Sequence, residues 1–202
     1  AVAGLLIGTQ ALSGGDSNAS TGRSPGGGAE TSGPNATGPA AQPVALTPAT
    51  VRVVDPGGDR TELGGVQRAF DGDLNTGWDE MDRYNRPAFG NIAGKDGMGI
   101  LIDLGEPHAV TSVKVDLSAS GATARLRHGT VDPGNSQAGD KQINQTYPTI
   151  AEFVDYNGTT MAFGGFDPDT KYRYLLVWIT KLPPDGDGRY TVGVQEISVL
   201  GH

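Results

Sequence analysis

A short acidic loop holds the densest group of potential metal ligands in the sequence. Residues 71–76 read DGDLNT, so two carboxylates, a hydroxyl and several backbone carbonyls fall within six positions, and Gly72 permits a tight turn. Calcium takes six to eight oxygen ligands in a flexible cage, which this composition suits. The alternative is an Asx turn without metal, in which Asp71, Asp73 and Asn75 bond to the local backbone. An EF-hand is not indicated, because position 12 of a loop that begins at Asp71 holds no glutamate.

Aromatic and basic side chains offer a second kind of chemistry, the recognition of a ligand by stacking and hydrogen bonding. Tyr84, Arg86 and Phe89 lie in a polar, irregular connection, so we expect them to contact a ligand, although loop packing is the ordinary role of such aromatics. Trp78 and Trp178 are also possible sugar-stacking platforms. Their positions, beside a tight loop and inside an apolar run, favour roles in the core.

Catalytic chemistry finds little support in the sequence. The three histidines, His108, His128 and His202, accompany no nucleophile motif, and most carboxylates stand in turns, where they are ordinarily solvated. The chain has no cysteine, which excludes thiol catalysis, disulfides and cysteine-ligated metals. We therefore expect a non-catalytic protein.

The charge of the chain limits its partners. A net charge of −8 argues against nucleic acid, because binding to phosphates needs a basic face. It also argues against adhesion to an anionic membrane surface.

The amino-acid composition changes twice along the 202 residues, which predicts three segments. Residues 1–12 are almost wholly apolar but too short to span a membrane, so we interpret them as the last part of a transmembrane helix. Residues 13–47 consist mainly of Gly, Ser, Pro, Ala, Thr and Asn and contain no aromatic residue, which predicts a disordered linker. Residues 48–202 form the expected domain.

That domain has the pattern of an all-β protein. Short runs rich in Val, Ile, Leu and Tyr alternate with turn sequences that contain Asp, Asn, Gly and Pro, and no helical pattern lies between them. The expected strands are 51–54, 99–104, 110–117, 123–127, 150–156, 172–180 and 192–200. About 155 residues of this kind suit an eight-stranded jelly-roll β-sandwich.

Three strings in this domain resemble the discoidin-like (galactose-binding-like) jelly rolls, which include many carbohydrate-binding modules. They are AFDGDLNTGW at 69–78, GILIDLG at 99–105 and the final strand QEISVLG at 195–201. The resemblance covers roughly residues 51–201. It implies a structural calcium ion held by the Asp73 side chain, Thr76, backbone carbonyls near Phe70 and Asp71, and Glu196.

Further strings resemble the C-terminal extracytoplasmic domain of actinobacterial MviN-type lipid II flippases and related kinase-like membrane proteins. They include PAFG at 87–90, GMG at 97–99 and the stretch 176–190. The resemblance implies a domain outside a bacterial membrane, attached to it only through the N-terminal helix. We expect a binding module for cell-wall glycan or its precursor. The alternative is an ectodomain that docks a cell-wall-synthesis protein and binds no sugar.

Overall fold

The computed structural model describes residues 40–47, 50–79 and 81–202. These residues fall within one compact unit, Gly38–His202. The predicted helix tail at 1–12 and most of the predicted linker lie outside the described residues. Within the described ranges, no helix is both long enough and apolar enough to cross a membrane.

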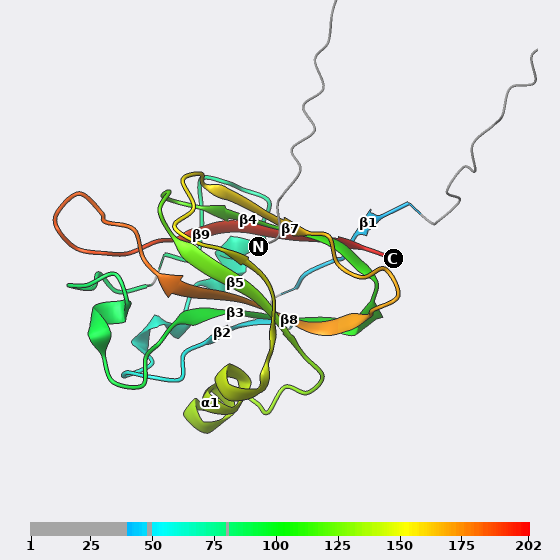
Figure 1. Ribbon diagram of the computed structural model, residues 1–202, viewed down its shortest axis with the longest axis horizontal. Helices are drawn as coiled ribbons and strands as arrows, with labels where there is room; N and C mark the ends of the chain where they lie inside the picture. Colours follow the sequence, from blue (N-terminus) through cyan, green and yellow to red (C-terminus); the bar gives the residue numbers. More distant parts are fainter. Residues whose placement is uncertain (1–39, 48–49, 80) are drawn as a thin grey trace, which may run out of the picture. The chain divides into compact units, whose positions relative to one another are not determined.

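Two antiparallel sheets face one another, which confirms the predicted all-β jelly-roll sandwich (Figure 1). One sheet has the strand order β1-β9-β4-β7 and the other the order β2-β3-β8-β5-β6. The strands are β1 (Gln42–Pro43), β2 (Val51–Val54), β3 (Met98–His108), β4 (Val110–Leu117), β5 (Thr123–Gly129), β6 (Thr149–Phe153), β7 (Thr160–Gly164), β8 (Tyr172–Lys181) and β9 (Val194–Gly201).

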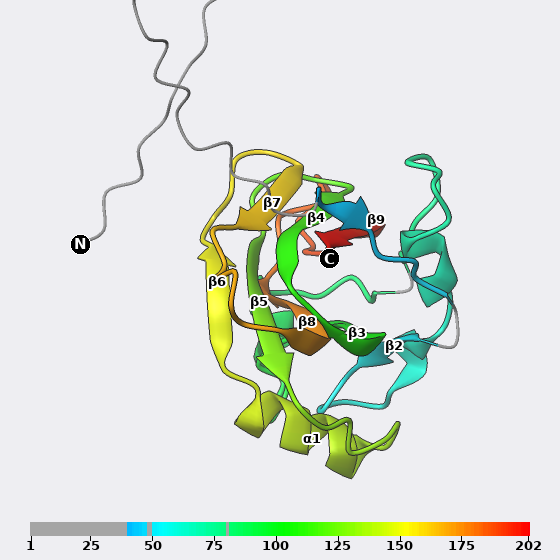
Figure 2. The ribbon, with the colours of Figure 1, turned by 90° about the vertical axis from the view of Figure 1, so that its right-hand side faces the viewer.

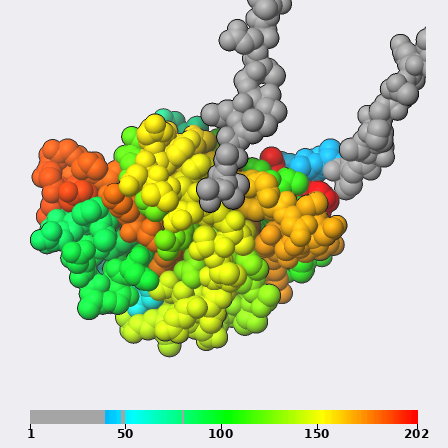
Figure 3. Space-filling model, in the orientation of Figure 1, coloured from blue at the N-terminus to red at the C-terminus, as the bar shows by residue number. Residues whose placement is uncertain are grey.

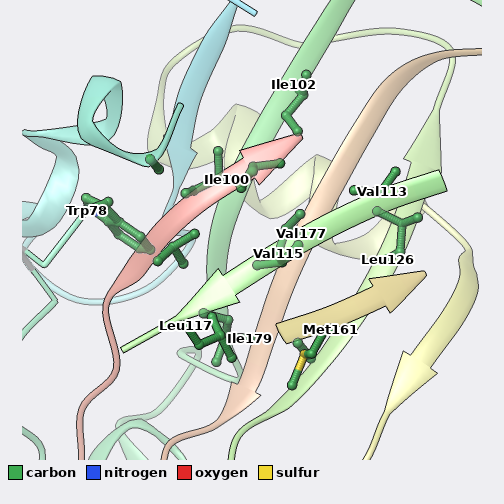
Figure 4. Packing of buried hydrophobic residues seen from close by; sticks show 14 of the residues in the cluster. Trp78, Ile100, Ile102, Val113, Val115, Leu117, Leu126, Met161, Val177 and Ile179 are labelled. Carbon is green, nitrogen blue, oxygen red and sulfur yellow. The ribbon is translucent and has the colours of Figure 1, made fainter. Parts of the chain in front are cut away.

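The main core fills the space between the two sheets, where buried side chains from both meet (Figure 4). Alternate residues of β8, among them Leu175, Val177 and Ile179, point into this core. Trp78 and Trp178 are both fully buried, which confirms the interpretation that favoured core roles. Neither presents a ring face to a ligand.

One α-helix of the described residues, α1 (Gln137–Thr146), covers the outer face of the five-stranded sheet (Figure 2). Ile143 of α1 packs with Leu176 and Trp178 of β8, so this strand is apolar on both faces because both are covered. No helix was expected here. The local signal is Ser136, whose hydroxyl accepts the Gly139 N–H at the start of the helix, as an N-cap does.

Two strands differ from the expected pattern. The sequence assigned residues 42–47 to the linker, but Gln42–Pro43 pair with β9 and the Val44 N–H donates to the Val199 carbonyl at 2.9 Å. The sandwich therefore begins before residue 48. β7 was also missed, because its alternation of exposed and buried residues spans only five positions.

The long connection between β2 and β3 holds most of the predicted site residues. It contains three short 3-10 turns, η1 (Thr61–Leu63), η2 (Val66–Ala69) and η3 (Phe89–Asn91). Its later part, residues 83–97, lies against the β8–β9 connection at one end of the molecule (Figure 3).

Candidate functional site

An open groove of about 930 Å³ lies where these two connections meet. Asp82, Arg83 and Asn85 come from the β2–β3 connection, and Arg189 comes from the β8–β9 connection. Ile92, 45% exposed, adds an apolar side chain. The groove thus offers hydrogen-bond donors, acceptors and a small apolar surface together.

Backbone pairing holds the two connections together. Tyr84 and Tyr190 exchange two N–H···O bonds of 2.9 Å each, as paired residues do in an antiparallel ladder. The Arg83 guanidinium donates to Asp185 and Asp187 at 2.6 Å each. In return, Arg189 donates to the backbone carbonyls of Arg83 and Tyr84. Each connection therefore contributes one arginine that binds the other.

The carboxylates at this end experience opposite electrostatic environments. Hydrogen bonding from Arg83 lowers the pKa of Asp185. Partial burial, together with the nearby negative charges of Glu62 and Asp59, raises the pKa of Asp82. Asp185 is thus stabilised in its ionised form by an arginine, whereas ionised Asp82 is disfavoured chiefly by partial burial.

Buried polar groups support the groove from below. Glu62, 2% exposed, accepts hydrogen bonds from the Tyr84 hydroxyl at 2.6 Å and from the Asp82 N–H at 2.7 Å. Its other oxygen pairs with Lys95 at 2.5 Å, and Lys95 also pairs with Asp55 at 3.1 Å. No sequence pattern pointed to these three residues, because their positions 55, 62 and 95 match no local motif.

The predicted ligand contacts are placed differently from the expectation. Phe89 is 0% exposed and belongs to the main core, and Tyr84 is 7% exposed. Their rings pack edge to face with centroids 5.3 Å apart, so this pair serves packing, and the nearly buried Tyr84 offers little surface to the groove that it helps to line. Both aromatics are buried because the connection folds back on the sandwich. Arg86 is exposed.

The acidic loop satisfies most of its own hydrogen bonds. The Asp71 carboxylate accepts the Thr76 hydroxyl at 2.8 and 3.0 Å and the Asp73 N–H at 2.9 Å. The Asp73 carboxylate accepts the backbone and side-chain N–H groups of Asn75 at 2.9 and 2.8 Å. These are the Asx turns of the metal-free alternative.

Glu196 nevertheless reaches this loop, as the resemblance implied. Its carboxylate accepts the Gly72 N–H at 3.1 Å, and burial together with the charges of Asp71 and Asp116 raises its pKa. The Thr76 hydroxyl lies within 3.0 Å of both the Asp71 carboxylate and the Asp73 carbonyl, so three kinds of oxygen converge. Calcium accepts this mixture. The Asp73 side chain itself bonds to Asn75, whereas the Asp71 carboxylate bonds to the Thr76 hydroxyl.

Across the described part of the chain, no three His, Cys, Asp or Glu residues gather into a metal-binding group. His128 lies away from the groove. Burial lowers the pKa of His128, and its ring packs against that of Tyr172 with centroids 5.2 Å apart.

The fold is similar to that of carbohydrate-binding modules. A mutant form of chitosan-binding module 1 from a chitosanase/glucanase of Paenibacillus sp. IK-5 shares 16% identity, with a TM-score of 0.52 over 80% of this chain and 100% of that module. Chitosan-binding module 2 from the same enzyme shares 13% (TM-score 0.48; 74% and 93% covered). A CBM32 module produced by Clostridium perfringens shares 10% (TM-score 0.47; 80% and 100% covered).

The first of these modules shares the jelly-roll fold of this chain. No protein-family model matches the sequence, and no curated protein matches it either. The resemblance to MviN-type membrane proteins stays a prediction.

Proposed function

We propose that this domain is a non-catalytic glycan-binding module and that the groove between the two connections is its binding site. The observation that carries the proposal is the groove itself, open and lined by the carboxylates of Asp79 and Asp82, an amide and guanidinium groups at one end of the sandwich. The shared fold with a chitosan-binding module adds support.

The side chains of the groove suit sugar hydroxyl groups. Asp82 accepts hydrogen bonds, Arg189 donates them, and Asn85 does both. Ile92 can pack against the C–H face of a ring. Because the groove is open and its arginines already bind other groups, affinity for a single sugar should be weak. Arg83 already pairs with Asp185 and Asp187, and the carboxylates of Asp79 and Asp82 line the groove, so a glycan rich in uronate should bind poorly.

We place this function at the bacterial cell envelope, on the outer side of the membrane. The support is the predicted order of helix tail, linker and sandwich, together with the resemblance to MviN-type proteins. The ligand would then be cell-wall glycan or its precursor. Docking of a cell-wall-synthesis protein is the second candidate, because the same polar groove can take a peptide.

We further propose structural calcium at the acidic loop. The Asp71 carboxylate, the Thr76 hydroxyl, the Asp73 carbonyl and Glu196 would hold it. The ion would join the early loop to the last strand and take no part in sugar binding.

The direct test is calorimetric titration of the full chain with glucosamine oligomers, N-acetylglucosamine oligomers, soluble muropeptides and an oligouronate. We expect binding to at least one of the first three and none to the uronate. Asp82→Ala and Asn85→Ala should abolish it. Arg173→Ala is the matched control, because this exposed residue pairs with Asp103, on a strand that does not line the groove. No binding to any glycan would contradict the proposal, as would affinity that is unchanged in both groove variants.

A further inference from the structure

A buried charged cluster lies beneath the groove, formed by Asp55, Glu62 and Lys95. Their exposed fractions are 0%, 2% and 4%, so all three side chains are almost completely shielded from water. Two carboxylates face one ammonium group, which leaves a net negative charge on the cluster. Removing charges from water is costly, and a buried ion pair is weak evidence of a stabilising role. The cluster therefore calls for another explanation.

Two stretches of the β2–β3 connection line the groove, residues 81–85 (the first wall) and residues 90–92 (the second wall). Glu62 binds the first wall. One carboxylate oxygen accepts both the Tyr84 hydroxyl and the Asp82 N–H, so a single atom fixes the backbone and a side chain of residues 82–84. The Glu62 carbonyl also accepts the Trp78 indole N–H at 3.2 Å. Glu62 lies at least 16 residues before these partners, so this is a tertiary contact.

Lys95 binds the second wall. The backbone N–H of Lys95 donates to the Ile92 carbonyl at 3.0 Å. The side-chain ammonium of Lys95 lies 5.5 Å from the centre of the Tyr84 ring. Close backbone packing holds it in place, since a side chain on Gly57 would approach the Gly94 carbonyl oxygen to 2.5 Å. The Glu62–Lys95 pair thus connects the wall that carries Asp82 to the wall that carries Ile92.

We propose that Glu62 and Lys95 are positioning residues of the glycan site, and that their ion pair sets the distance between the two walls of the groove. This inference rests on the proposed function of the groove. Asp55 completes the cluster from the end of β2, and its own N–H donates to Asp140 of α1 at 3.0 Å. The cluster therefore fixes both walls to the sandwich.

The test compares three variants with one control. Glu62→Gln keeps an oxygen for Tyr84 and Asp82 but removes the charge that Lys95 needs, and Lys95→Met keeps much of the volume without the charge. The double variant removes the whole pair. Arg52→Gln is the control, because Arg52 pairs with Asp132 and Asp140 and touches no wall of the groove.

Affinity is measured for the tightest glycan of the panel, well below each melting temperature. We expect each single variant to lose affinity about tenfold, as for loss of one charge-assisted hydrogen bond, and the double variant to lose no more than the worse single one. Arg52→Gln should lower the melting temperature with unchanged affinity. Unchanged affinity in folded Glu62→Gln and Lys95→Met would overturn the inference.

Amide hydrogen exchange supplies a readout that needs no glycan. Exchange at the Asp82 and Tyr84 amides should accelerate about tenfold in Glu62→Ala, which removes the oxygen that accepts the Asp82 N–H, relative to amides of β3 and β8. It should stay unchanged in Arg52→Gln. If the wild-type protein binds no glycan while this acceleration occurs, the proposed function fails and the positioning role of Glu62 stands. If exchange at both amides is unchanged, the positioning role fails.

Discussion

The acidic loop at 70–76 and the segment at 81–95 carry most of the predicted site residues, yet they use their polar groups in different ways. In the loop, Asp71 and Asp73 bond to partners no more than five residues away. In the segment, Tyr84 bonds to Glu62 and to Tyr190, which are 22 and 106 residues distant in the chain. The first is local turn chemistry, whereas the second exists only in the folded protein.

Bonds within a turn can be predicted from a sequence, whereas the burial of an aromatic side chain in an irregular connection cannot. Exposed Asp and Asn residues in a tight turn form similar bonds in many folds, so their type and spacing are informative. An aromatic residue in an irregular connection is exposed or buried according to what packs against it, and neither its type nor its spacing gives that information.

The largest expected effect comes from Phe89→Ala. Because Phe89 is fully buried between the segment and the sandwich, its truncation should lower the free energy of unfolding by about 3–5 kcal/mol. Leu74→Ala in the acidic loop is the matched control, since Leu74 is 53% exposed and should change stability by less than about 0.5 kcal/mol. Urea unfolding measures both. A small loss for Phe89→Ala would restore its predicted role as an exposed ligand contact.

Added calcium should stabilise the folded protein through the acidic loop. If the ion binds the folded state alone, a hundredfold excess over Kd should raise the free energy of unfolding by about 2.7 kcal/mol. Asp71→Ala should remove this gain. Asp73→Ala should cost little stability and keep most of the calcium dependence, because its exposed side chain caps the turn at Asn75. Thermal melts in calcium and in chelator measure the effect, and identical wild-type curves would leave the loop as turn chemistry alone.

A fall in pH should change stability in opposite directions through the acidic loop, at Asp73, and through the buried cluster beneath the groove, at Asp55. Hydrogen bonds from Asn75 lower the pKa of Asp73 below its ordinary 3.8, so the stability it contributes is present above that value and is lost as pH falls through the lowered pKa. Burial raises the pKa of Asp55 despite the opposing effect of Lys95, so ionised Asp55 reduces stability, and that reduction disappears as pH falls through the raised pKa. Carboxyl-carbon NMR titration should find Asp55 titrating above Asp73; the reverse order would contradict the contrast.

The smallest expected effect belongs to Arg86→Ala. Arg86 is exposed and does not line the groove, so stability should change by less than about 0.5 kcal/mol and glycan affinity by less than about twofold. Denaturant unfolding and calorimetry measure these. A loss of affinity as large as that of Asn85→Ala would extend the site beyond the groove and restore Arg86 as a ligand contact.

Most of the fold could be predicted because its signals are local. Alternating apolar residues separated by turn sequences predicted the strands of a jelly roll, and the burial of both tryptophans followed from their positions. The strands that were missed, β1 and β7, are too short to show a period. Helix α1 was missed because its polar sequence carries little beyond the Ser136 cap.

For the candidate site, the sequence placed Asp71, Asp73 and Thr76 in one loop and left a turn and a calcium site open, and the Glu196 carboxylate reaches that loop. Only the tertiary structure decided that Phe89 and Tyr84 are buried, and that Asp55, Glu62 and Lys95 meet beneath a groove. The physical reason is that a turn satisfies its polar groups within a few residues. A buried charge must instead find partners wherever the folded chain brings them, and one sequence does not contain that information in any local pattern.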